Sequence, residues 1–238
     1  MNILLLRGLV REKRHWGNFP DMLREKGHQV LCIDLPGVGE NADLEFPWNL
    51  KEAVKKIRHQ FLNQKSAGPY ELVAISLGGM IALEWANLFP ADFTKLYLIN
   101  TSAANLGTPW ERMRPKAMQQ CLQISTEKDV REREKIILQM TTNTFHKNPQ
   151  LLDEWYKIAI DSPYTSQTVV RQLTAAIRFK APKKINVPVI LLASENDNMV
   201  NVNCSKRLAK RLQAEIRIHP TAGHDIAVDD PAWLTNQI

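Results

Sequence analysis

The chain has 238 residues, of which 44% are apolar and 24% charged, and its formal net charge is +6. These values are ordinary for a soluble globular protein, and the length suffices for one large α/β domain or a domain with an insertion. No apolar stretch approaches the ~20 residues of a membrane span. The first residues lack the charged start and cleavage site of a secretory signal, so we expect no membrane association.

The cysteines and histidines also narrow the class of protein. Cys32, Cys121 and Cys204 lie far apart and form no C-x-x-C pair, which favours reduced thiols in a cytoplasmic protein over a disulfide framework. The six histidines show neither H-x-H nor H-E-x-x-H spacing. The sequence therefore predicts no metal site.

Strand and helix patterns alternate along the first hundred residues and again near the end of the chain. Strands are predicted at 3–6, 29–34, 72–75, 94–99, 187–193 and 214–219, and helices at 16–26, 50–62, 80–90, 202–212 and from residue 230 onward. Between them, residues 102–183 show four helical patterns, at 110–124, 130–140, 148–159 and 168–179, with almost no strand signal.

This alternation predicts an α/β fold with a mostly parallel six-stranded sheet and helices on both faces. The helical stretch is too long for a loop, so we expect an inserted helical lid after the fourth strand. The expected division is 1–101 for the first part of the core, 102–183 for the lid and 184–238 for the second part. The sequence ends soon after Trp233, which predicts a short last helix or a shortened chain end.

One segment combines a buried strand, a sharp turn and an amphipathic helix. The apolar run 72–75 ends at Ser76, which lies between Ala74 and Gly78 in the G-x-S-x-G pattern of a nucleophile elbow. The turn requires small residues two positions before and after the serine, and alanine in place of the first glycine meets that steric requirement. A buried serine at a strand end is the alternative interpretation.

Polar residues that would activate such a serine follow two later strands. Asp197 comes four residues after the strand at 187–193, and His224 follows the strand at 214–219. A serine hydroxyl needs an adjacent base, and an imidazole needs a carboxylate that fixes its tautomer. Because the carboxyl ends of parallel strands meet at one edge, we expect Ser76, Asp197 and His224 to form a catalytic triad in that chain order.

Each of these residues also has a purely structural interpretation. His224 alone would be an ordinary loop histidine, and Asp197 alone a helix cap or turn residue. Glu195 and Asp225 compete for the acid role; Asp197 is favoured because it lies far enough past its strand to curl back, whereas Asp225 adjoins the histidine and should point away. Asp34 lies in an Asp-x-Pro-Gly turn, which indicates a structural role.

Two backbone N–H groups are predicted to form an oxyanion hole. One belongs to Leu77, the residue after the nucleophile, and the other to Leu9, in the loop after the first strand. Gly8 would let that loop approach the serine closely.

These residues together resemble the α/β-hydrolase superfamily over almost the whole chain, from Leu4 to Trp233. The matching segments are Arg-Gly-Leu at 7–9, where the family has His-Gly-x, and those at 34–39, 74–79, 196–197 and 223–224. The match begins at the strand that the family counts as its third. Within the superfamily, the chain is most similar to the pimeloyl-carrier methyl ester carboxylesterases of biotin synthesis, and the likeness extends into the predicted lid.

Two features depart from that pattern or add to it. Arg7 replaces the usual histidine, and its charge is predicted to tighten the oxyanion loop, repel a cationic substrate or attract an anionic one. The predicted lid carries a modest excess of basic residues. A solvated helix face with local ion pairs is one explanation, and a docking surface for an acyl carrier protein, which the resemblance implies, is the other. Interspersed acidic residues argue against nucleic acid.

The sequence thus predicts a cytoplasmic serine carboxylesterase that hydrolyses a small carboxylic ester through an acyl-enzyme and needs no cofactor. The lid is expected to cover an apolar acyl pocket. The candidate substrate-binding residues are Trp110, Met113, Met140, Trp155 and Tyr156. The same triad also serves lactone, thioester, amide or C–C bond hydrolysis, and a catalytically silent member of the fold would bind a small molecule instead.

Overall fold

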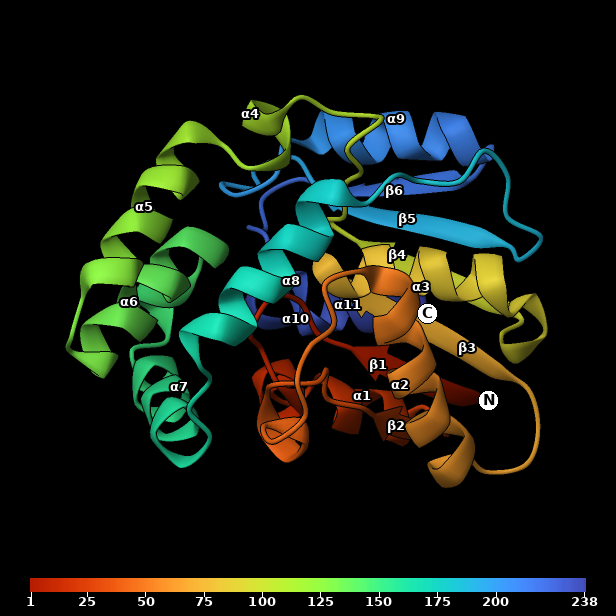
Figure 1. The fold of residues 1–238 in the computed structure, drawn as a ribbon, viewed down its shortest axis with the longest axis horizontal. Coiled ribbons are helices and arrows are strands. Elements are labelled where there is room, and N and C mark those ends of the chain that lie inside the picture. Colours follow the sequence, from red (N-terminus) through yellow and green to blue (C-terminus); the bar gives the residue numbers. More distant parts are fainter.

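Six strands form one sheet in a computed structural model that describes all residues from 1 to 238 (Figure 1). The strands are β1 (Asn2–Leu6), β2 (Gln29–Cys32), β3 (Tyr70–Ile75), β4 (Lys95–Ile99), β5 (Val189–Ser194) and β6 (Glu215–His219). Their order is β2-β1-β3-β4-β5-β6, and every neighbouring pair is parallel. The predicted six-stranded α/β fold is confirmed, with a sheet that is parallel throughout.

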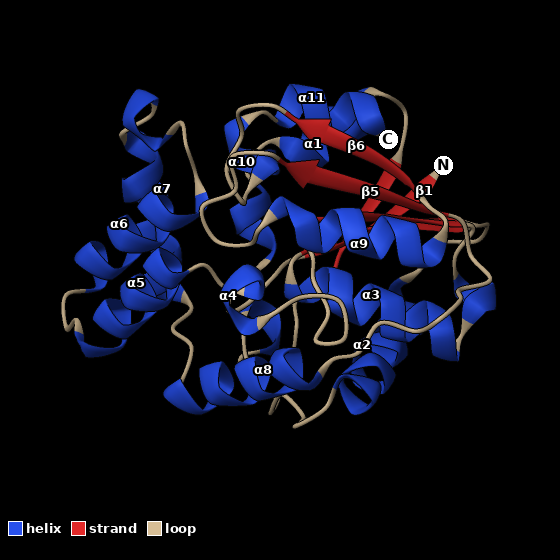
Figure 2. Ribbon diagram, turned by 90° about the horizontal axis from the view of Figure 1, so that it is seen from above, coloured by secondary structure: helices blue, strands red, loops and turns tan.

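Helices cover both faces of this sheet. The core helices are α1 (Phe19–Glu25), α2 (Leu50–Gln64), α3 (Leu77–Leu88), α9 (Val202–Leu212), α10 (Ile226–Asp229) and α11 (Pro231–Gln237). Figure 2 shows α1, α10 and α11 on one side of the strands and α2, α3 and α9 on the other. Leu4 and Leu6 of β1 face the larger core beneath α2 and α3, whereas Ile3 and Leu5 face the core beneath α1 and α11. Burial on both faces explains why the central strands are continuous apolar runs.

Five helices lie between β4 and β5. They are α4 (Pro109–Arg112), α5 (Pro115–Thr126), α6 (Val130–Thr141), α7 (Gln150–Asp161) and α8 (Ser166–Arg178). Figure 2 shows α5, α6 and α7 beyond the carboxyl ends of the strands, whereas α8 lies nearer to α3. We call residues 102–183 the helical insertion; its role as a lid stays a prediction.

Two predicted helices begin or divide differently in the structure. The single helix expected at 110–124 is two helices, because the N–H of Arg114 donates to the carbonyl of Met199 at 2.8 Å and Pro115 has no N–H to continue the first helix. The helix expected at 16–26 begins at Phe19, since Gly17 has a φ of 57° and separates it from a 3₁₀ turn.

None of the helices combines the length and apolar character that crossing a bilayer requires.

Candidate active site

Ser76 lies in a strained turn between β3 and α3. Its φ is 56° and its ψ is −116°, a conformation that costs energy for any residue with a side chain and is concentrated at functional sites. Two flanking hydrogen bonds of 2.8 Å hold the turn: the N–H of Ser76 donates to Ile99, and the Thr101 hydroxyl donates to the carbonyl of Ser76. The surrounding structure therefore imposes the strain, as an elbow requires.

The glycines after Ser76 are required by close packing. A Cβ at Gly78 would lie 2.5 Å from the carbonyl oxygen of Arg7, and a Cβ at Gly79 would lie 2.8 Å from Cβ of Thr101. Helix α3 thus begins directly against the loop that follows β1. Gly8 in that loop packs less tightly, but a Cβ there would still lie only 3.2 Å from Cβ of Ser76.

A buried carboxylate orients the candidate base. Nδ1 of His224 is 2.8 Å from Oδ2 of Asp197, and the two residues are only 4% and 2% exposed. The second oxygen of Asp197 accepts the N–H groups of Met199 and Val200 at 2.7 and 2.9 Å. With its proton on Nδ1, the imidazole has Nε2 free to accept a proton.

The electrostatic surroundings of His224 favour its charged form. Burial lowers its pKa, but the charge and the hydrogen bond of Asp197 and the charge of Asp225 together outweigh burial, so the pKa lies above the ordinary value of 6.5. The Ser76 side chain is partly exposed and makes no hydrogen bond to His224 in this structure. Such contacts are often loose in a ligand-free site, and the serine–imidazole contact is part of the proposal below.

The competing acidic residues are engaged elsewhere. Asp225 forms a buried ion pair with Arg7 through both guanidinium Nη atoms, and Glu195 pairs with Lys206 at the surface. Asp34 accepts the N–H groups of Lys13 and Glu40, in keeping with its predicted structural role. Asp197 is thus the carboxylate that contacts the imidazole.

The predicted oxyanion donors flank the nucleophile. Leu77 is the first residue of α3, and Leu9 follows Gly8 in the loop that passes Ser76. Neither backbone N–H donates to another group of the chain. Both are therefore available to a bound oxyanion.

Asn100 joins the ends of three elements and was missed by sequence reasoning. It follows β4 with a φ of 45°, and its side-chain carbonyl accepts the N–H of Ser194 at 2.8 Å. Its amide nitrogen donates to the carbonyl of His224, also at 2.8 Å. A polar residue directly after a predicted strand, at the edge that carries Ser76, is the signal that would have found it.

A short segment at the end of α6, in the helical insertion, is hydrogen-bonded to the loops that carry Asp197 and His224. Asp229 accepts the N–H groups of Gly223, Asn143 and Thr144. The side-chain amide of Asn143 donates to the carbonyls of residues 196 and 221 at 3.1 and 3.0 Å. These contacts, which the sequence did not reveal, tie the end of α6 to the loops of Asp197 and His224.

The five predicted substrate-binding residues do not gather in one place. Met113 and Met140 belong to one apolar cluster with Met199 and Val200, which adjoin Asp197. By contrast, Trp155 packs among α6 and α7 residues, and its ring lies 5.1 Å from the Arg11 guanidinium. The other two residues belong to neither cluster: Trp110 is 62% exposed, and the ring of Tyr156 lies 5.7 Å from the Arg131 guanidinium.

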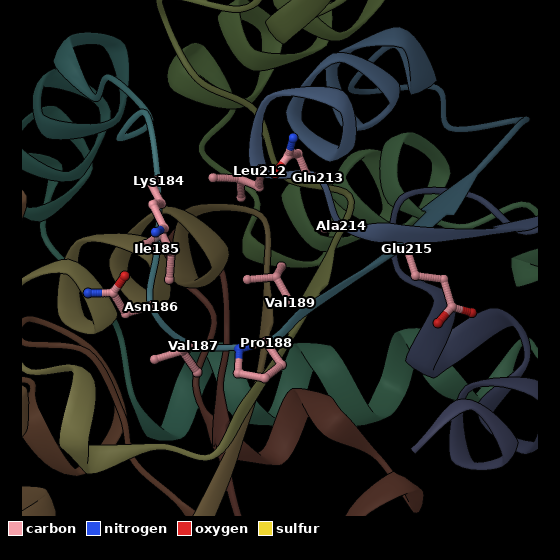
Figure 3. Close-up of a pocket in the computed structure, with 10 residues that line it drawn as sticks. All are labelled: Lys184, Ile185, Asn186, Val187, Pro188, Val189, Leu212, Gln213, Ala214 and Glu215. Atoms are coloured by element: carbon pink, nitrogen blue, oxygen red, sulfur yellow. The ribbon is translucent and has the colours of Figure 1, made fainter.

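Two other features lie outside this constellation. No group of three or more His, Cys, Asp or Glu side chains lies close enough together to hold a metal ion. Figure 3 shows a pocket formed by residues 184–189 and 212–215, at the amino ends of β5 and β6. It contains no serine, cysteine or histidine and lies at the opposite edge of the sheet from Ser76.

The parallel sheet, the strained serine turn and the buried acid–imidazole pair define an α/β-hydrolase. The family model described as the alpha/beta hydrolase family matches residues 3–237, and the chain belongs to that family. An esterase from Exiguobacterium antarcticum has the same fold, with a TM-score of 0.80 and 16% identity over 100% of this chain and 90% of that one.

Curated relatives are distant in sequence. A Haemophilus influenzae protein provisionally named 2-succinyl-6-hydroxy-2,4-cyclohexadiene-1-carboxylate synthase is 24% identical over 100% of this chain and 96% of its own. A monoacylglycerol lipase of Homo sapiens is 25% identical over 97% of this chain and 72% of its own. The biotin biosynthesis bifunctional protein of Teredinibacter turnerae is 32% identical, but over only 42% of this chain and 17% of its own.

The buried Arg7–Asp225 pair generates a prediction for stability. Arg7→Met should lower the free energy of unfolding by about 3–5 kcal/mol, because it leaves the Asp225 charge buried without a partner. Adding Asp225→Asn should recover part of that loss. Urea unfolding of both single variants and the double variant measures the coupling. Lys206→Met, which breaks the exposed pair with Glu195, is the control and should cost less than about 1 kcal/mol; strictly additive effects of the Arg7 and Asp225 changes would contradict the prediction.

Proposed function

We propose that the chain is a serine carboxylesterase that hydrolyses a small carboxylic ester. The observation that carries this proposal is the buried hydrogen bond between Asp197 and His224, at the sheet edge where Ser76 is held in a strained turn. A carboxylate fixing the tautomer of an imidazole beside a strained serine is an arrangement suited to nucleophilic catalysis. The esterase and lipase names among the relatives support the same class of reaction.

The proposed reaction has two halves that use the same groups. The Ser76 hydroxyl oxygen attacks the acyl carbon while its proton passes to Nε2 of His224, and the N–H groups of Leu77 and Leu9 hold the oxyanion that forms. Collapse of the tetrahedral intermediate breaks the bond to the alcohol, which leaves with the proton from His224. Water then attacks the acyl-enzyme, gives its proton to His224, and releases the acid and the free serine.

A fluorophosphonate probe tests the nucleophile directly. The native protein should be labelled at Ser76, and Ser76→Ala should abolish both labelling and hydrolysis of p-nitrophenyl esters of short to long acyl chains. Ser125→Ala is a useful control, because it removes a serine hydroxyl at an exposed position of α5 and no proposed reacting group. A native protein that is not labelled, or labelling that persists in Ser76→Ala, would instead support a non-catalytic small-molecule-binding protein.

The pH dependence of the reaction follows from the raised pKa of His224. The imidazole must be neutral to accept a proton, so kcat/KM should rise with pH through a midpoint above 6.5. Asp197→Asn should move that midpoint downward, because burial then acts without the carboxylate, and should lower kcat by ~10⁴-fold. A pH–rate profile of each protein measures both effects; an unchanged midpoint would show that Asp197 does not act on the titrating group.

A finer part of the proposal is that the substrate is the methyl ester of an acid bound to an acyl carrier protein. The helical insertion carries both paired and unpaired cations: Arg131 pairs with Asp153 at 2.6 Å, whereas Lys116 and Lys128 are exposed and form no ion pair. Unpaired basic side chains on the helical insertion would attract an acidic carrier. The partial similarity to the Teredinibacter turnerae protein supports this choice of substrate.

Charge reversal on the insertion tests the carrier. The Lys116→Glu, Lys128→Glu double variant should raise KM for a carrier-bound methyl ester about fivefold and leave the free methyl ester unaffected, because only the carrier meets that surface. Lys55→Glu on α2 is the control. If the carrier-bound and free esters react at equal rates at both low and high salt, the carrier has no part in recognition, although the esterase proposal would stand.

A further inference from the structure

Gln172, on α8, is fully buried, and only one of the two polar atoms of its amide makes a hydrogen bond. Its exposed fraction is 0%, and its carbonyl oxygen Oε1 accepts the backbone N–H of Val10 at 2.8 Å. Its nitrogen Nε2 is buried as well, but it has no hydrogen-bond partner in the chain. A buried donor without a partner typically costs ~1–3 kcal/mol, so its presence requires an explanation.

The residue that Gln172 holds is itself strained. Val10 has a φ of 46°, which is unfavourable for a β-branched side chain. It follows Leu9, the proposed oxyanion donor, and Gly8, whose Cβ would lie 3.2 Å from Cβ of Ser76. Gln172 therefore helps to fix the turn that passes the nucleophile. Because Oε1 and Nε2 are bonded to one carbon, the unpartnered nitrogen also lies beside this turn.

The charges around the turn indicate what kind of acceptor this nitrogen would meet. The two buried cations of the segment are already neutralised, since Arg7 pairs with Asp225 and Arg11 pairs with Glu134 at 2.7 Å. A substrate carboxylate placed there would be desolvated without a free counter-charge. A neutral oxygen, such as a ketone carbonyl, needs only an N–H donor, and the Nε2 of Gln172 is one without a partner.

We propose that Gln172 is a specificity-determining residue whose Nε2 donates a hydrogen bond to a keto oxygen in the acyl group, so that the preferred substrates are esters of oxo acids. This inference rests on the proposed esterase function and names its substrate class. Through Oε1 the same side chain positions the oxyanion turn, which couples recognition of the acyl group to the place where the oxyanion forms.

The test compares acyl groups of equal length that differ in one carbonyl. Wild-type protein is assayed with methyl hexanoate and with the methyl esters of 3-, 4- and 5-oxohexanoic acid, and acid release is followed at constant pH. At least one oxo ester should have a KM about tenfold below that of methyl hexanoate, the effect expected of one added hydrogen bond to a buried donor. Equal KM values for all four esters would overturn the proposal without any variant.

A single substitution then distinguishes the role of the Gln172 nitrogen from that of its oxygen. Gln172→Glu retains an oxygen for the N–H of Val10 but replaces the donor nitrogen by a second acceptor. At pH 8 it should abolish the roughly tenfold difference in KM between the preferred oxo ester and methyl hexanoate, whatever the common loss with both esters. Gln123→Glu, the same change at an exposed position of α5, is the matched control. Equal losses with both esters, or no loss with either, would overturn the proposal.

Fluorophosphonate labelling distinguishes failure of this inference from failure of the proposed function. If Ser76 of the native protein reacts with the probe but the four esters do not differ in KM, the esterase proposal stands and only the role of Gln172 is rejected. If Ser76 does not react, both are rejected. Gln172→Leu removes both polar atoms and should slow labelling, because the oxyanion turn then loses its support at Val10.

Discussion

The parallel pairing of β3 with β1 on one side and β4 on the other determines where chemistry can occur in this chain. Each strand of the sheet ends at the same edge, so the loops carrying Arg7, Ser76, Asn100, Asp197 and His224 meet there. The central strands are mostly apolar runs buried on both faces. Polar groups therefore accumulate beyond the strand ends, where each must find a partner.

Those partners account for much of the order at the edge. Arg7 and Asp225 neutralise each other, Asp197 accepts two backbone N–H groups besides contacting His224, and Asn100 bridges the ends of β4, β5 and the histidine loop. Most buried charges and amides in this set have a partner in a different loop. The few exceptions are informative for that reason, and two of them, Nε of Arg7 and the nitrogen of Gln172, lie at the loop that passes Ser76.

The sequence predicted the sheet and the placement of Ser76, Asp197 and His224 because both depend on local signals. An apolar run followed by a small-residue turn indicates the candidate nucleophile, and polar residues after strands indicate the candidate acid and base. Asn100 and Gln172 escaped prediction because their partners lie 94 and 162 residues away along the chain. The division at Pro115 escaped for the same reason, since the acceptor of the Arg114 N–H belongs to the loop after β5.

The attachment of residues 141–144 to the loops of Asp197 and His224 has a consequence for how such chains diversify. Asn143 and Asp229 form a seam between the helical insertion and the core, and each side supplies part of the hydrogen bonds of the other. An insertion transplanted from a relative would have to bring an equivalent of Asn143 with it, or the backbone around the histidine would lose its support. In this chain, the helical insertion and the loops of Asp197 and His224 therefore depend on the same few hydrogen bonds.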